Sequence, residues 1–212
     1  MLGESGMDGL SIRELCKRAN IALRTLYNTF YSKDRLVAIA IRDAYDQVNR
    51  NIRYRTPSDT LDGVIDRMIL TYRSSMAARN FTRSISSLYF VPGLSPDIWT
   101  ALQNMVFRNL NPWLHKVERD GELQAGVHVD ELAGIIANME YSTSHDWSEG
   151  RISDPDFIHR LVTGMLRISA GSMLGGAQQR ALHFLSLIHD GGTLPVFPNP
   201  GWRDNREEKS DS

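Results

Sequence analysis

Cysteine is nearly absent from this sequence, whose 212 residues include one, Cys16. A single cysteine excludes an intramolecular disulfide, which agrees with a reducing compartment. No apolar run approaches the ~18 residues needed to span a membrane. The N-terminus also lacks the charged and then apolar stretch of a signal peptide. Together these absences predict a cytoplasmic protein that has no membrane partner.

Recognisable catalytic motifs are missing as well. The sequence contains no G-x-S-x-G, no Walker loop and no G-x-G-x-x-G. Its six histidines include no H-x-x-x-H pair, although a metal site assembled in three dimensions stays open. Cys16 lies on the apolar face of a predicted helix, where packing explains it better than nucleophilic chemistry. We therefore predict that the protein is not an enzyme, and the sequence indicates no cofactor and no metal.

What the sequence does contain is a helix-turn-helix pattern in residues 11–36, SIRELCKRANIALRTLYNTFYSKDRL. Ser11 can cap a first helix whose apolar residues recur at helical spacing. Asn20 then stands where the chain must turn, and asparagine tolerates the left-handed conformation. A second helix, from about Leu23 to Phe30, places Leu26 and Phe30 inward. Ser32 can cap a third helix that starts at residue 33 and carries an acidic residue near its positive end.

The outer face of the second helix carries side chains that suit the major groove of DNA. Arginine, threonine, tyrosine and asparagine hydrogen-bond to phosphates and to base edges. The alternative is an ordinary pair of helices with polar outer faces. The residues left on the outer faces are Leu23, Arg24, Thr25, Tyr27, Asn28 and Thr29.

This stretch resembles the N-terminal domain of the TetR family of bacterial transcriptional regulators. Asn20 replaces the usual turn glycine, and only MLGESGMDG stands where the family has a full first helix. We therefore expect either a start further upstream or a loosely packed head. The resemblance implies that Ser11, Thr25, Tyr27 and Lys33 contact phosphates, with Arg13, Leu23, Arg24 and Asn28 nearer base edges. The matching positions are Ser11, Leu15, Ala19, Ile21, Thr25, Leu26, Tyr27, Phe30, Ser32, Lys33 and Leu36.

The distribution of charge agrees with a DNA-binding head. Residues 1–55 carry ten basic and six acidic side chains, whereas the remainder carries 14 and 19. A basic head on an acidic body is typical of a DNA-contacting domain joined to one that does not bind DNA. The excess of basic residues in the head is small, so by itself it is weak evidence, and it serves to support the motif.

Beyond the motif every periodic segment reads as a helix, which predicts an all-α protein. We expect a helix-turn-helix domain in residues 1–50 with a truncated first helix. A helical regulatory and dimerisation domain in residues 51–190 and a disordered tail in 191–212 should follow. The expected helices are 33 to about 54, 58–79, 81–90, 96–117 with a kink at Pro112, 130–147, 154–174 and 178–189.

The body is rich in aromatic residues and methionines, each of which is most simply explained as core. As a set they could also line a pocket between helices. The resemblance favours a small apolar effector there, with His145 and Asp146 as its polar contacts. The predicted ligand-binding residues are Tyr72, Met76, Trp99, Met105, Trp113, Met139, His145 and Asp146.

Residues 130–148 and 154–174 resemble the helix pair that joins two protomers of the family. The alternative is that this face is buried within one protomer. The sequence thus predicts a homodimeric, ligand-responsive repressor that binds a palindromic double-stranded DNA operator. A different class of protein remains open, namely a helical small-molecule-binding protein or an enzyme on a regulator-like scaffold that no longer binds DNA.

Overall fold

The computed structural model describes residues 12–20 and 22–197, and these residues form helices joined by turns. A single bridge between Leu123 and Met173 is the only β-structure in that part of the chain. None of the described helices is long and apolar enough to cross a membrane. The predicted all-α fold is confirmed.

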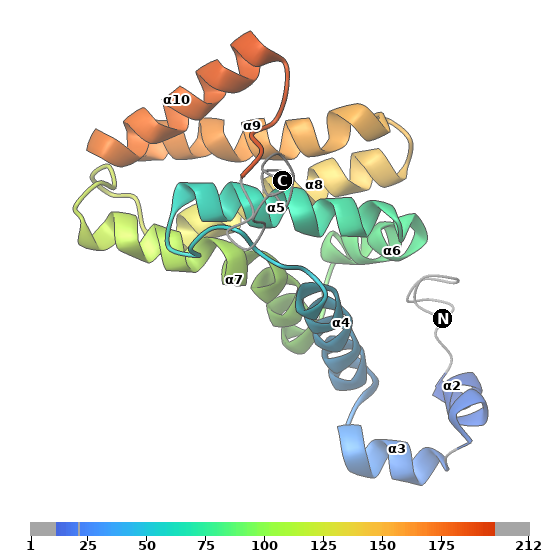
Figure 1. The fold of residues 1–212 in the computed structure, drawn as a ribbon. Coiled ribbons are helices and arrows are strands. Elements are labelled where there is room, and N and C mark those ends of the chain that lie inside the picture. The colour runs from blue at the N-terminus through green and yellow to red at the C-terminus, as the bar shows by residue number, and fades with distance from the viewer. Residues whose placement is uncertain (1–11, 21, 198–212) are drawn as a thin grey trace, which may run out of the picture.

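The helix-turn-helix pattern forms α2 (Ile12–Ala19) and α3 (Leu23–Phe30), followed by the longer α4 (Lys33–Arg50). Figure 1 shows α2 and α3 at the far end of α4, away from the other helices. The predicted bounds of the second motif helix are confirmed. The predicted end of α4 near residue 54 is wrong.

Polar contacts end α4 at Arg50. The Asn49 side-chain amide donates to the Tyr45 backbone carbonyl oxygen at 2.8 Å, and the Tyr54 hydroxyl donates to the Asn49 side-chain oxygen Oδ1. Five residues after α4 ends, the Arg55 backbone N–H donates to the buried Asp66 carboxylate at 2.7 Å. These contacts compete with helical hydrogen bonds and turn the chain toward the body.

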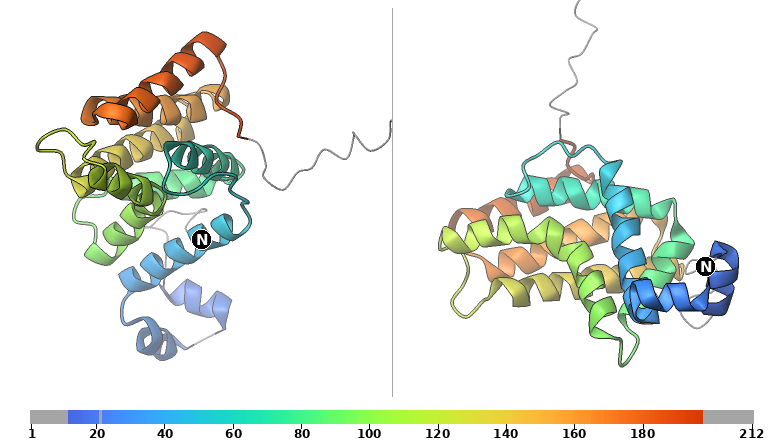
Figure 2. Two further views of the ribbon diagram at one scale, coloured as in Figure 1. Left: turned by 60° about the vertical axis from the view of Figure 1, so that its left-hand side comes forward. Right: turned by 90° about the horizontal axis from the view of Figure 1, so that it is seen from below.

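The body consists of six further helices in the described residues, packed around one apolar core. Figures 1 and 2 show α5 in its interior and α10 lying across α9 on the outside. Each helix buries an apolar stripe against its neighbours, and that burial is the main force that holds a helical bundle together. The helices are α5 (Leu61–Met76), α6 (Arg79–Tyr89), α7 (Pro96–Arg119), α8 (Val129–Ser148), α9 (Asp154–Ser172) and α10 (Gly175–Gly191).

The start of α5 differs from the predicted start at Ser58. Thr60 is the N-cap, and its hydroxyl accepts a hydrogen bond from the Gly63 N–H at 3.0 Å. A Cβ atom at Gly63 would lie 1.8 Å from the Pro57 carbonyl oxygen. The turn before α5 therefore requires glycine at position 63.

The start of α10 also differs from the prediction, which placed a break at the glycine pair and a helix from Gln178. Gly175 and Gly176 begin α10, and the Glu122 carboxylate caps it by accepting from the Gly176 N–H at 2.6 Å and the Ala177 N–H at 3.1 Å. A carboxylate at a helix N-terminus is favoured by the helix dipole. The break lies at the extended residue Leu174.

The bend predicted in the long helix is present, and Figures 1 and 2 show the two halves of α7 at an angle. Pro112 lies inside this helix. Proline has no N–H to donate to the carbonyl of the preceding turn, and its ring pushes that carbonyl away. The first half of α7 is thereby directed toward α4.

The residues after α10 begin by packing on the body, although the sequence predicted disorder from Gly191. Phe197 is buried, and the Arg55 guanidinium donates to its carbonyl oxygen at 2.8 Å. Residues 198–212 lie outside the described residues, so the rest of the predicted tail is not tested.

Candidate functional site

The helix-turn-helix is held by a tight turn and a few buried side chains. Asn20 has a φ of 50°, the left-handed conformation predicted for the turn. Leu26 is 1% exposed and anchors α3, while Phe30 is only half-buried. Cys16 is buried on α2, which agrees with a packing role. Ser11 lies outside the described residues.

The outward face of α3 is exposed as the sequence predicts. The Thr29 hydroxyl donates back to the Thr25 carbonyl oxygen at 2.9 Å, so its proton is already used. Arg13 on α2 is exposed as well, and it adds a positive charge to the same end of the molecule. The exposed residues of α3 are Leu23, Arg24, Thr25, Tyr27, Asn28 and Thr29.

The turn between α3 and α4 contains an exposed tyrosine, Tyr31, that the sequence analysis did not name. Tyr31 has a φ of 63°, uncommon for a residue other than glycine, and is 71% exposed. The Arg35 guanidinium lies 5.2 Å from the centre of its ring. Ser32 accepts a hydrogen bond from the Arg35 N–H at 3.1 Å, which confirms the predicted cap. Lys33 is half-buried at the first position of α4.

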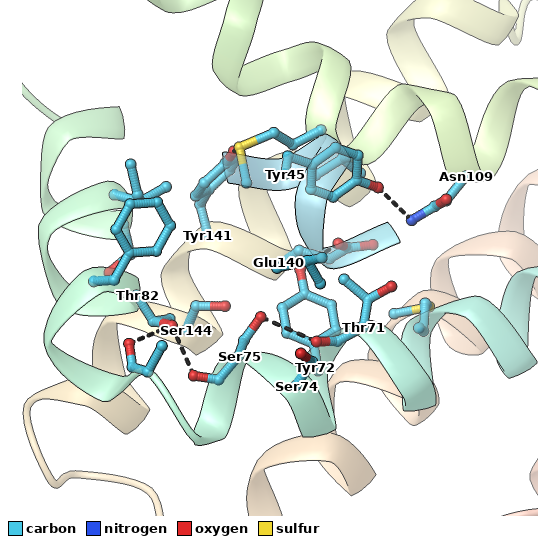
Figure 3. A pocket seen from close by; sticks show the side chains of 18 of the residues that line it. Tyr45, Thr71, Tyr72, Ser74, Ser75, Thr82, Asn109, Glu140, Tyr141 and Ser144 are labelled. Atoms are coloured by element: carbon cyan, nitrogen blue, oxygen red, sulfur yellow. Dashed lines mark hydrogen bonds between the residues drawn. The ribbon is translucent and has the colours of Figure 1, made fainter. Parts of the chain in front are cut away.

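A second candidate site is a cavity in the body between α4, α5, α6, α7 and α8. Its volume is about 100 Å³, counted as the space open to the centre of a water molecule, which leaves room for several waters or one small ligand. A more open hollow beside it shares Ala44, Val48, Ser74 and Phe81 with it. Most of the lining is apolar or hydroxyl-bearing, and Figure 3 shows the polar residues.

A buried carboxyl group is the most unusual feature of this cavity. Glu140 on α8 is 4% exposed, and its Oε2 accepts a hydrogen bond from the Tyr72 hydroxyl at 2.5 Å. Burial raises the pKa of the Glu140 carboxyl to about 7, and the Tyr72 hydrogen bond opposes that rise. Burial, followed by the Glu140 charge, raises the pKa of Tyr72 and Tyr141 well above the ordinary value.

Comparison with known proteins identifies the head. The sequence model of a family described as "Bacterial regulatory proteins, tetR family" matches residues 1–39. The N-terminal domain is that of a TetR family regulator. The match covers α2, α3 and the first part of α4, and it confirms the resemblance seen in the sequence. No curated protein and no solved structure matched the chain. The protein is therefore a DNA-binding transcriptional regulator.

The cavity includes few of the predicted ligand-binding residues. Tyr72 and Met105 line it, and the other six do not. Trp99 stacks on Tyr89 with ring centres 4.7 Å apart, and Trp113 is buried in the core. The predicted residues outside this lining are Met76, Trp99, Trp113, Met139, His145 and Asp146.

The remaining residues outside the lining have other partners. Met139 packs against Gly164 on α9, where a Cβ would lie 2.9 Å from its sulfur. His145 lies 3.4 Å from the Ser87 hydroxyl, and Asp146 accepts from the Arg151 guanidinium at 2.8 Å. These contacts hold neighbouring segments together and leave the side chains outside the cavity.

The sequence reasoning missed the polar side of the cavity, including Glu140. A signal was available, because Glu140 follows Ile136 by four residues on the predicted apolar face of its helix. A charged residue at such a position is rarely fully buried unless it is paired. Tyr45 and Asn109 were missed as well, since the first lies on a helix assigned to the head.

The helix α4 links the two candidate sites. Tyr45, which lines the cavity, accepts a hydrogen bond from the Asn109 amide of α7 at 2.8 Å. The Arg108 guanidinium of α7 forms an ion pair with Asp46. The N-terminal end of α4 directly follows the turn after α3. A shift of α4 against α7 would therefore move α3.

Proposed function

We propose that this regulator is a repressor that binds a palindromic operator as a homodimer and is released by a small ligand in the body cavity. In this proposal residues 1–50 form the DNA-binding head and residues 51–190 the regulatory body. The observation that carries it is the double role of α4, which bears the head and also forms a wall of the cavity through Ala44, Tyr45 and Val48.

The head should read DNA through α3 in the major groove. The exposed face of that helix suits base edges and phosphates, with Arg24 and Asn28 nearest the bases. Thr25, Tyr27 and Lys33 are proposed to hold phosphates, as Ser11 is by resemblance. Two such heads on a two-fold axis would contact major grooves about 34–36 Å apart, or a multiple of that distance.

Two copies are proposed to meet along α8 and α9. Ile135 on α8 is 47% exposed although it is a large apolar residue. Gly171 leaves open space on α9, on which another backbone could approach closely, and Ile168 on the same helix is half-buried. A two-fold axis through this surface would bring the same apolar patch of each copy together.

Ligand control follows from a difference in affinity between two arrangements of α4. A ligand that fits the cavity better in one arrangement favours that spacing of the two heads, whereas a ligand with equal affinity for both changes nothing. A coupling of ~1–3 kcal/mol would weaken operator binding by about 5–150-fold. The contacts of Tyr45 with Asn109 and of Asp46 with Arg108 are where we expect the rearrangement.

The first experiment selects bound DNA from random genomic fragments and measures the affinity of the purified protein for the selected site. The proposal expects a palindromic sequence that is bound by a dimer. The Arg24→Ala variant should lose preference at one position in each half-site. If no fragment is enriched, the alternative of a helical binding protein with an inactive head is favoured instead.

The second experiment tests the dimer surface with a matched pair of variants. Ile135→Arg places a charge on the α8 surface, and Leu187→Arg places one on α10, where Leu187 is 49% exposed. Sedimentation should show that Ile135→Arg is monomeric and that Leu187→Arg remains dimeric. The opposite result would move the interface to α10.

A further inference from the structure

The chemistry of the cavity wall indicates which class of ligand it takes. One carboxyl group faces the cavity, and the described lining residues include no lysine, arginine or histidine. In the described part of the chain, the Tyr72 hydroxyl is the only hydrogen-bond donor to the Glu140 carboxylate. A buried charge without a partner of opposite sign is costly, and a bound cation would remove that cost.

Aromatic rings surround the same carboxyl group. Tyr45 from α4, Tyr72 from α5 and Tyr141 from α8 all line the cavity. Each is near enough to Glu140 for the carboxylate charge to raise its phenol pKa. Figure 3 shows Glu140 between the rings of Tyr45 and Tyr72. The faces of such rings attract cations, most strongly where water is excluded.

The hydroxyls of Tyr45 and Tyr141 have hydrogen-bond partners other than the Glu140 carboxylate. The Tyr141 hydroxyl donates to the Leu102 carbonyl oxygen at 2.7 Å, and the Tyr45 hydroxyl accepts from Asn109. Arg108 on α7 pairs with Asp46, and its guanidinium lies 5.8 Å from the centre of the Tyr45 ring. An anionic ligand would meet Glu140 with no compensating charge in the described lining.

We propose that the cavity binds an apolar cation, an ammonium group with apolar substituents, whose charge contacts Glu140 and the rings of Tyr45, Tyr72 and Tyr141. Apolar residues such as Phe81 and Met105 hold the uncharged part of the molecule. This assignment rests on the proposed function, in which the cavity is the effector site.

The test compares a cation with its neutral isostere. Benzyltrimethylammonium and neopentylbenzene have nearly the same shape, and each is titrated calorimetrically into the full-length protein at pH 8. The cation should bind at least about tenfold more tightly, since a desolvated cation–aromatic contact is itself worth about that factor. Equal affinities for the two compounds, or no binding of the cation, would overturn the proposal.

The Glu140→Gln variant tests the carboxylate directly. Glutamine keeps the shape of the side chain and still accepts the Tyr72 hydrogen bond, but it has no charge. Its affinity for the cation should fall by about 10–100-fold, while its affinity for the neutral compound should stay as in the wild type. Ser144→Ala is the control, because it changes the lining without changing the charge. An equal effect of Glu140→Gln on both compounds would refute the assignment.

The pH dependence gives an independent measurement. Cation affinity should rise about tenfold from pH 6 to pH 8, as Glu140 ionises, and should be constant in Glu140→Gln. The other titratable or charged groups around the carboxyl are Tyr45, Tyr72, Tyr141 and Arg108. The pKa of each of these three tyrosines is raised, so none of them ionises in this range. A pH-independent affinity of the wild type would contradict the proposal.

These results separate the two proposals. If the cation binds as expected but leaves operator affinity unchanged, the cation site stands and ligand control of DNA binding fails. If Glu140→Gln binds the cation as well as the wild type does, the charge assignment fails, whereas the proposed regulator is untouched.

Discussion

Replacing Glu140 by glutamine should make the folded protein more stable at alkaline pH. The carboxyl has a pKa of about 7 when folded, against 4.5 when unfolded. Between these values the folded state binds a proton that the unfolded state does not, so stability falls as the pH rises. With 1.36 kcal/mol per pKa unit, the loss amounts to about 3 kcal/mol once the pH exceeds 7.

The assay is urea unfolding at pH 5 and pH 8 at one protein concentration, followed by the fluorescence of the four tryptophans. From pH 5 to pH 8 the wild type should lose about 2–3 kcal/mol more than Glu140→Gln. Glu131→Gln is the control, because Glu131 is exposed on α8 and should behave as the wild type does. If the difference between wild type and Glu140→Gln is the same at both pH values, the buried carboxyl is not held as the structure describes.

Further variants test the head and two helix starts. Lys33→Ala should weaken binding to every DNA sequence and reduce the slope of log affinity against log salt by about one. A change of sequence preference in this variant would refute the phosphate contact. Arg24→Ala should instead cost ~1–3 kcal/mol of binding free energy at one operator position. Gly63→Ala should destabilise the body by ~1–3 kcal/mol in thermal melts, because its Cβ would overlap the Pro57 carbonyl. Glu122→Gln should cost ~0.5–2 kcal/mol by weakening the cap of α10, and an unchanged melting temperature would contradict that role.

The features predicted correctly are those with a local cause. The bounds of α3, the left-handed Asn20 and the Ser32 cap all follow from residues within a few positions of each other. Ser153 caps α9 in the same local way, because its hydroxyl accepts a hydrogen bond from the Asp156 N–H. A sequence read in order contains this information, because capping and turn formation depend on neighbours along the chain.

The features that were missed have distant causes. The cap of α10 comes from Glu122, which is more than fifty residues away in sequence. The end of α4 depends on Tyr54 and on Asp66, a residue of the next helix. No local pattern indicates such a contact, so the boundaries shift while the helices themselves remain as predicted.

The cavity was harder to predict than the head. Large aromatic side chains indicate burial, but most of them pack in the core and do not line the cavity. Trp147, for example, stacks on Phe157 with ring centres 4.4 Å apart and lies deep in the core. A cavity forms where side chains fail to meet, and that depends on how five helices pack together. Glu140 was the one residue whose type and position together could have indicated it.

The most direct test of the account is a reciprocal titration of ligand and operator. Benzyltrimethylammonium is titrated into the protein alone and into the protein saturated with its selected operator. If α4 couples the cavity to the head, operator DNA should weaken ligand binding by the same factor by which the ligand weakens operator binding, about 5–150-fold. Identical ligand affinities in the two titrations would contradict the coupling.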